Sequence, residues 1–227
     1  MTTHHRRILS FVVAALLLVA CSRAPQPAGA GRFRAEIWVD NWFALYAGEK
    51  LIGEDSVPIM TERSFNAEVF AFDADYPLTL NFVVKDFKEN DTGLEYVGKP
   101  NQQLGDGGAI AQFTDSTTGA LVAVTNEDWR CLVIHDAPLD PGCANERAPV
   151  AGQSPCLFDS QPEPAGWKAP GFDDSAWPHA VVYGAAEVGP KDGYNQISWR
   201  PAAKFIWGPN LKTNNTLLCR LAVAAQK

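Results

Sequence analysis

The stretch AEIWVDNWFALYAGEKLIG (residues 35–53) decides the fold class. It contains three short runs rich in β-branched and aromatic residues, at 35–39, 42–46 and 51–53. The second and third runs are separated by a short loop that contains Gly48. Two such runs joined by a short glycine-containing loop are typical of a β-hairpin. We therefore predict antiparallel strands in this part of the chain.

Similar runs recur along the rest of the chain. They occupy residues 67–72, 78–87, 109–114, 121–125, 130–135 and 216–223. Turn-forming residues separate several of them, as in Asn90-Asp91-Thr92-Gly93 and Gly105-Asp106-Gly107-Gly108. No segment carries a sustained apolar stripe with the 3.6-residue period of a helix. The pattern predicts an all-β protein, an antiparallel sandwich or jelly roll.

A long connection interrupts this pattern between residues 136 and 166. It is rich in proline and contains Cys143 and Cys156. Loops of this length are usually functional or disordered, and a disulfide within it favours order. No shift in composition marks a second domain. We therefore predict one sandwich over residues 33–227, with a disulfide-stapled loop at about 136–166.

The N-terminal segment has the pattern of a secretory signal peptide. His4-His5-Arg6-Arg7 is followed by an apolar run over residues 8–20. A helix needs about 20 apolar residues to cross a membrane, so this run is too short to span it. Residues 1–20 are therefore predicted to be a signal peptide, and the polar, proline-containing segment at 21–32 a flexible tether.

The sequence Leu18-Val19-Ala20-Cys21 resembles the lipobox of bacterial lipoproteins. The resemblance implies that Cys21 becomes the acylated N-terminus, carrying palmitate-type chains that anchor the protein to a membrane. Two or more acyl chains give stable anchoring without a transmembrane helix. Ser22 in place of Asp implies the outer membrane, on its periplasmic side or facing the cell surface.

The charge of the chain disfavours nucleic-acid binding. It has 19 basic and 26 acidic side chains, a formal net charge of −7. Removal of residues 1–20, which include Arg6 and Arg7, makes the mature chain more acidic still. An acidic surface repels phosphate backbones. The membrane, reached through the lipid anchor, and a carbohydrate or envelope protein are the partners that remain.

Four cysteines are left when Cys21 carries lipid, and an even number in an exported protein predicts disulfides. Three pairings are possible. We favour Cys143–Cys156, which flank a proline-rich stretch, and Cys131–Cys219, which lie in two strand-like runs. A zinc site is the alternative, but no C-x-x-C or paired-histidine spacing supports it.

Two stretches resemble one recognised family. Residues 40–53, DNWFALYAGEKLIG, resemble a hairpin of galactose-binding-like jelly rolls, which accompany many glycoside hydrolases. Gly166-Trp167 with GFDDSAWP (residues 171–178) resembles the W…FDDSxW element of the same modules, and residues 205–220 fit their closing strands. Ala47 and Glu49 depart from the usual Asn-Gly turn. Within the family some modules bind sugars, some bind calcium structurally, and many only pack against a neighbouring domain.

Several polar residues are candidates for chemistry. Asp173 and Asp174 fit a turn, or a carboxylate pair acting as acid and base. His135 and His179 are the two histidines of the mature chain, but no G-x-S-x-G elbow accompanies them. No organic cofactor is indicated. Calcium is the one ion that the sequence suggests, because oxygen ligands are gathered at Asp86, Glu89, Asn90, Asp91 and Glu95, and at residues 192–195.

Aromatic residues near the C-terminal third suggest a binding surface. Tyr183, Tyr194 and Trp199 lie on one proline- and glycine-containing segment and could stack against sugar rings. We therefore predict a noncatalytic, envelope-anchored binding module, with carbohydrate as its ligand. The alternatives are a glycan- or cell-wall-active hydrolase that uses Asp173 or Asp174, and a structural partner of another envelope protein.

Overall fold

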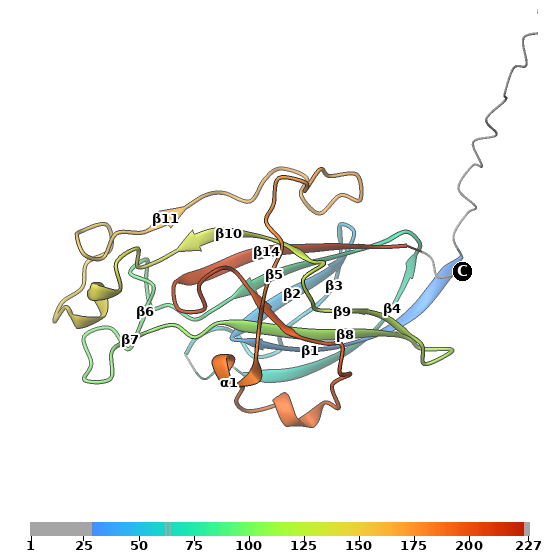
Figure 1. Ribbon diagram of the computed structural model, residues 1–227, viewed down its shortest axis with the longest axis horizontal. Helices are drawn as coiled ribbons and strands as arrows, with labels where there is room; N and C mark the ends of the chain where they lie inside the picture. Colours follow the sequence, from blue (N-terminus) through green and yellow to red (C-terminus); the bar gives the residue numbers. More distant parts are fainter. Residues whose placement is uncertain (1–28, 62, 64, 225–227) are drawn as a thin grey trace, which may run out of the picture.

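The computed structural model describes residues 29–61, 63 and 65–224. Two six-stranded antiparallel sheets lie face to face, and a third sheet has two short strands (Figure 1). The prediction of an all-β antiparallel sandwich is therefore confirmed. In the described residues no helix is long and apolar enough to cross a membrane. Cys21 and the predicted signal peptide lie outside the described residues.

The first sheet, sheet A, contains the N-terminal strand β1 between β8 and the edge strand β4. Its strand order is β12-β13-β8-β1-β4, and β9 pairs with β8. The strands are β1 (Ala30–Asp40), β4 (Asn66–Asp75), β8 (Gly108–Asp115), β9 (Leu121–Val124), β12 (Val181–Tyr183) and β13 (Phe205–Trp207). β1 begins inside the predicted tether, because Ala30, Gly31 and Arg32 extend its ladder with β4.

The second sheet, sheet B, contains the predicted hairpin, β2–β3, at one edge. Its strand order is β11-β10-β14-β5-β2-β3. The strands are β2 (Trp42–Ala47), β3 (Lys50–Glu54), β5 (Leu78–Lys85), β10 (Arg130–Asp136), β11 (Asp159–Ser160) and β14 (Asn214–Val223). Gly48 turns the hairpin with a φ of 55°, which glycine adopts without strain.

The remaining elements are short. β6 (Leu94–Glu95) and β7 (Gln103–Leu104) form the two-stranded sheet. One α-helix, α1 (Ala185–Val188), and two 3-10 helices, η1 (Pro141–Asn145) and η2 (Tyr194–Gln196), lie in the connections.

The main core fills the space between the two sheets. Large side chains from both sheets, including Phe33, Phe43, Phe82, Phe113 and Trp129, are almost completely buried there. Phe82 stacks on Trp129 with ring centroids 5.3 Å apart. Burial of this apolar surface is the main source of stability of the sandwich.

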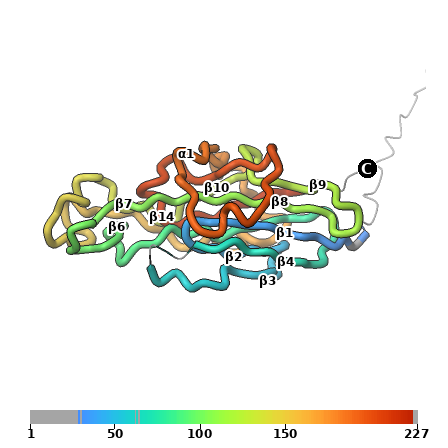
Figure 2. Tube along the Cα trace, turned by 90° about the horizontal axis from the view of Figure 1, so that it is seen from below, coloured from blue at the N-terminus to red at the C-terminus, as the bar shows by residue number. Residues whose placement is uncertain are grey.

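Part of the outer face of each sheet is covered as well. The segment that carries Trp167 and Trp177 packs on Val83 and Leu218 of sheet B. The segment that contains α1 and η2 packs around Trp38 of sheet A. Figures 1 and 2 show α1 beside this sheet. β5 is consequently buried from Leu78 to Val84, although the polar residues Thr79 and Asn81 alternate with its first apolar residues.

The FDDSAW element closes the cover of sheet B. Asp173 Oδ1 accepts a hydrogen bond from the backbone of Ser175 at 3.0 Å, a local turn contact. Asp174 Oδ2 binds Nε of Arg220 at 2.8 Å, and Arg220 is only 3% exposed. Arg220 also donates to Asn81 Oδ1 and to the carbonyl of Trp167. Asp174 therefore neutralises a buried arginine that links the cover to the sheet.

Both favoured disulfides are confirmed. Cys131–Cys219 joins directly paired residues of β10 and β14. Cys143–Cys156 closes a loop within the irregular segment and packs on Leu94. The predicted long loop is present, and it also contains η1 and β11.

The two ends of the sandwich differ. Ala30 pairs with Asp75, and Val223 pairs with Leu78, so the described chain ends meet at one end. Asp40, the last residue of β1, and Lys85, the last residue of β5, lie at the opposite end beside β6 and β7 (Figure 1). At about 3.3 Å per residue, β1 separates the two ends by roughly 33 Å.

The Asp174–Arg220 contact generates a stability prediction. In Asp174→Asn the buried guanidinium loses its charged partner, so the free energy of unfolding should fall by about 2–3 kcal/mol. Asp173→Asn, the matched control, removes one charge from an exposed turn and should change stability by less than about 1 kcal/mol. Urea unfolding of both variants tests this. Equal effects would contradict the structural role assigned to Asp174.

Candidate metal centre

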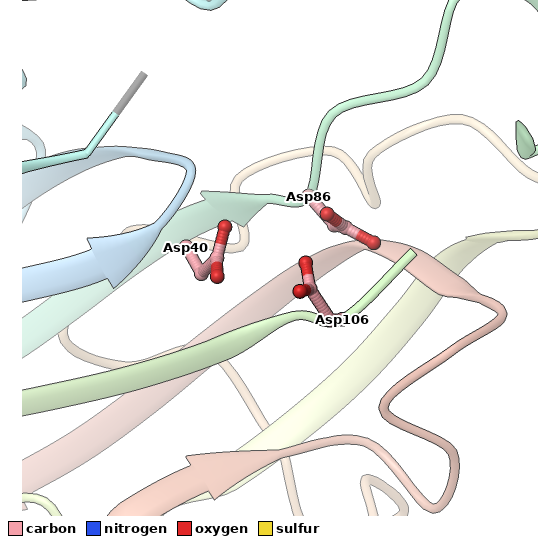
Figure 3. Close-up of side chains that lie close together, drawn as sticks. All are labelled: Asp40, Asp86 and Asp106. Atoms are coloured by element: carbon pink, nitrogen blue, oxygen red, sulfur yellow. The ribbon is translucent and has the colours of Figure 1, made fainter. Parts of the chain in front are cut away.

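Three aspartates meet where two strands end and a third begins. Asp40 is the last residue of β1, Asp86 directly follows β5, and Asp106 precedes β8. One carboxylate oxygen from each lies within 4.8 Å of the others. Figure 3 shows the three side chains pointing toward a common point from separate segments. We call Asp40, Asp86 and Asp106 the aspartate centre.

Two of these carboxylates are inside the protein. Asp40 is 0% exposed and Asp86 is 2% exposed. Among the described residues, no hydrogen bond reaches either oxygen of either group. Burial raises the pKa of both carboxyls well above the usual range, and nearby acidic groups raise it further. A buried carboxylate is stable only when it is protonated or paired with a cation.

Lys191 supplies one positive charge to the centre. Its Nζ lies 2.7 Å from Asp106 Oδ2 and 3.6 Å from Asp40 Oδ2. Burial alone would lower the pKa of Lys191, but the charges of Asp40 and Asp106 outweigh it and raise this pKa. Glu95, which is 1% exposed, adds another negative charge that acts on Asp40 and Asp86. One lysine therefore does not balance the acidic groups gathered here.

The dimensions of the centre fit calcium. Ca²⁺ binds 6–8 oxygens at about 2.3–2.6 Å, so oxygens on opposite sides of the ion lie roughly 4.8 Å apart. The carboxylate oxygens of the centre all lie within 4.8 Å of one another, so one Ca²⁺ ion can contact all three groups. The centre is therefore a candidate Ca²⁺ site.

The glycine-rich run at residues 105–108 makes room for the centre. A Cβ at Gly105 would lie 1.8 Å from Asp86 Oδ2, and a Cβ at Gly107 would lie 2.5 Å from the Trp207 ring. Only glycine allows the backbone to approach these groups so closely. The sequence pattern GDGG therefore brings Asp106 into the centre in addition to forming a turn.

The acidic run proposed from sequence contributes only in part. Asp86 belongs to the centre, and Glu95 lies close enough to act on it electrostatically. Asp91 instead binds Lys88 at 2.6 Å, and Glu89 lies 3.7 Å from Lys99. Asn90 accepts a hydrogen bond from the backbone of Thr92. Asp40 and Asp106 were not recognised from sequence because they are far apart in the chain and each lies beside a turn.

The second acidic segment, residues 192–195, has a packing role. The carbonyl of Asp192 accepts a hydrogen bond from the buried indole of Trp38 at 2.9 Å. Lys191, the residue directly before this segment, forms an ion pair with Asp106 of the aspartate centre.

The three aromatic residues predicted to bind ligand are partly buried. Tyr183 donates its hydroxyl to the carbonyl of Gly208 at 2.7 Å. Tyr194 is stacked on both Trp199 and Phe205, with ring centroids 5.7 and 5.4 Å away. Trp199 alone of the three lines an open groove, which also contains Arg34 and Arg200.

The two histidines among the described residues have contacts typical of structural residues. His135 is 8% exposed, and its ring nitrogens lie 2.9 Å from Asn215 Oδ1 and 3.1 Å from Asp91 Oδ1. His179 Nδ1 lies 2.8 Å from the carbonyl of Glu127. Neither of these contacts involves a nucleophilic side chain.

Comparisons with protein-family models, with curated proteins and with solved structures found no match to this chain. The aspartate centre therefore has to be interpreted from its own geometry.

We predict that calcium stabilises the folded protein. A ligand present at 100 times its Kd adds about 2.7 kcal/mol to the free energy of unfolding. For a chain of this size, that increase raises Tm by roughly 5–10 °C. Thermal unfolding in Ca²⁺ and in EDTA measures the shift. Asp86→Asn should abolish it, whereas Asp91→Asn, the control, should retain it. An equal Tm in Ca²⁺ and EDTA would contradict the site.

The pH dependence without calcium gives an independent check of the same prediction. Asp40 and Asp86 have raised pKa values in the folded protein, so the folded state retains protons that the unfolded state releases. The stability of the EDTA-treated protein should therefore fall as pH rises above about 4. Saturating Ca²⁺ should reduce this fall.

Proposed function

We propose that this chain is a noncatalytic binding module of the bacterial envelope, anchored by lipid and stabilised by calcium. The observation that carries the proposal is the pair of buried carboxylates, Asp40 and Asp86, which accept no hydrogen bond of normal length from the described residues and which converge with Asp106. A hard cation satisfies these oxygens with no change in the fold. Calcium then joins the ends of β1 and β5 to the segment before β8.

The direction of the chain supports anchoring at the N-terminus. β1 begins at the end of the sandwich opposite the aspartate centre. A lipid on Cys21, joined by the predicted tether, would attach at that end and leave the calcium-bound end pointing away from the membrane. The lipobox resemblance and Ser22 favour the outer membrane as the site of anchoring.

The contacts of Asp173 and Asp174 support a noncatalytic role. Asp174 binds the buried Arg220, and Asp173 holds a local turn. Hydrogen bonding to Ser175 keeps the pKa of Asp173 below its usual range, which is unsuitable for a general acid. These contacts favour a binding module over a hydrolase that uses this pair.

Carbohydrate is the ligand that we propose for the module. The likeness of residues 40–53 and 166–178 to galactose-binding-like jelly rolls supports it, as does the open groove beside Trp199. An envelope protein is the alternative partner. It is favoured by two exposed leucines that lie side by side on the long loop, Leu139 at 51% and Leu157 at 46% exposure.

A glycan array tests the ligand. We expect the purified protein, with both disulfides intact, to bind one class of sugar saturably in Ca²⁺. The same array in EDTA shows whether calcium in the aspartate centre contributes to binding. Asp91→Asn, which removes one charge outside the aspartate centre, is the control and should bind the same sugars as the unmodified protein. Absence of binding to every sugar in both conditions would exclude carbohydrate and leave the envelope protein as the partner.

Lipid attachment is tested by metabolic labelling. Cells that express the protein should incorporate an alkyne-tagged palmitate into it, and Cys21→Ser should lose the label. Mass spectrometry of the mature N-terminus should show an acylated Cys21. A mature chain that begins elsewhere, without lipid, would refute the anchor.

A further inference from the structure

A groove on the outer face of sheet A has a rigid, hydrogen-bonded floor. β1 and β8 place Arg34 opposite Thr114, and Glu36 opposite Gln112, in two adjacent cross-strand pairs. The segment 198–201, which includes Trp199 and Arg200, forms the wall beside them. The groove encloses about 550 Å³, which is large enough for one or two sugar rings.

Gln112 fixes the floor to the wall. Its Nε2 donates to Glu36 Oε2 at 2.7 Å and to the carbonyl of Ser198 at 3.2 Å. Its Oε1 accepts from the backbone of Arg200 at 2.7 Å. Gln112 is 3% exposed, so each of these contacts is shielded from water. The position of the wall is therefore set before any ligand arrives, which lowers the entropic cost of binding.

Positive charge is concentrated in this groove. Arg34 and Arg200 line it, and Glu36 is the one acidic residue among its lining side chains. One guanidinium nitrogen of Arg34 forms an ion pair with Glu36 Oε1 at 3.0 Å, and the Arg34 side chain is still 50% exposed. Guanidinium groups bind carboxylates through two parallel hydrogen bonds. In a chain with net charge −7, this local excess of arginine favours an anionic ligand.

Trp199 gives the groove an apolar surface. One face of its indole is stacked on Tyr194, and its N–H donates to the carbonyl of Tyr194 at 3.1 Å, so the ring is held in place. A fixed aromatic ring beside cationic and amide groups suits a ligand with both a flat apolar face and an acid group. A sugar ring that carries a carboxylate has both features.

We propose that this groove binds an acidic saccharide, with the carboxylate of a uronic-acid residue held between Arg34 and Arg200 and its ring against Trp199. The inference rests on the proposed binding-module function and names its site and class of ligand. None of the groove residues belongs to the aspartate centre, so the two sites can be tested separately.

The test is a calorimetric titration of the purified protein with oligogalacturonate and with its methyl ester, a probe of the same ring structure without the charge. EDTA is present, so that the acidic probe cannot act by removing calcium. We expect binding of the acid form and about tenfold or weaker binding of the ester, because the arginine contacts are lost.

Variants locate the site. Arg200→Gln leaves the core intact because the side chain is exposed, and it should weaken binding of the acid form about tenfold. Trp199→Ala should weaken binding of both forms. Arg147→Ala, an exposed arginine on the disulfide-stapled loop, is the control and should have no effect. Thermal unfolding of each variant confirms that it is folded.

Three results would overturn the proposal: no binding of the acid form, equal binding of acid and ester, or unchanged binding in Arg200→Gln. Thermal unfolding of the same proteins in Ca²⁺ without EDTA, compared with EDTA alone, shows the state of the aspartate centre. If the acid form does not bind but calcium still raises Tm, this inference alone is rejected. If the acid form binds but calcium does not raise Tm, the metal centre alone is rejected.

Discussion

The structure depends on one constraint, which is that apolar side chains on the outer faces of the sheets, as well as those between the sheets, must be shielded from water. The core between the sheets buries only the inner faces, and β5 carries apolar side chains on both of its faces. Trp167 and Trp177 cover one outer face, and the segment around Trp38 and Phe205 covers part of the other. The long connections are therefore structural layers. This explains why a chain with few helices has so much ordered irregular backbone, and why Arg220 is buried beneath one of these layers.

The sequence predicted the strands best where they are long and apolar. β1, β2, β5, β8 and β14 all overlap the predicted runs, because each carries several apolar residues close together in its sequence. β12 was not predicted, because a run of three residues resembles loop sequence, and β13 was expected only through the family resemblance of residues 205–220. β13 pairs with β8, which is distant in the chain, and β12 pairs with β13.

The candidate sites were harder to predict for a related reason. The aspartate centre draws one residue from each of three strand ends, and only the sheet topology brings them together. Locally, Asp40 belongs to a hairpin motif and Asp106 to a glycine-rich turn. The groove likewise joins cross-strand pairs of β1 and β8 to a segment more than 80 residues away along the chain, through Gln112 and Arg200. Of the three aromatic residues predicted from sequence, Trp199 lines this groove, whereas the stacking surface of Tyr194 is already occupied.

The position of Lys191 connects these features. Its ammonium group reaches the aspartate centre from the segment that goes on to form η2 and the wall of the groove. Asp192, the next residue, is held by the indole of Trp38, and Tyr194 packs against the same ring. Lys191 offsets only part of the acidic charge, so a divalent cation entering the centre would compete with it for Asp40 and Asp106. Displacement of the lysine would act first on the segment 191–194. In this way one electrostatic contact links the proposed calcium site at the end of the sandwich to the wall of a groove on its face.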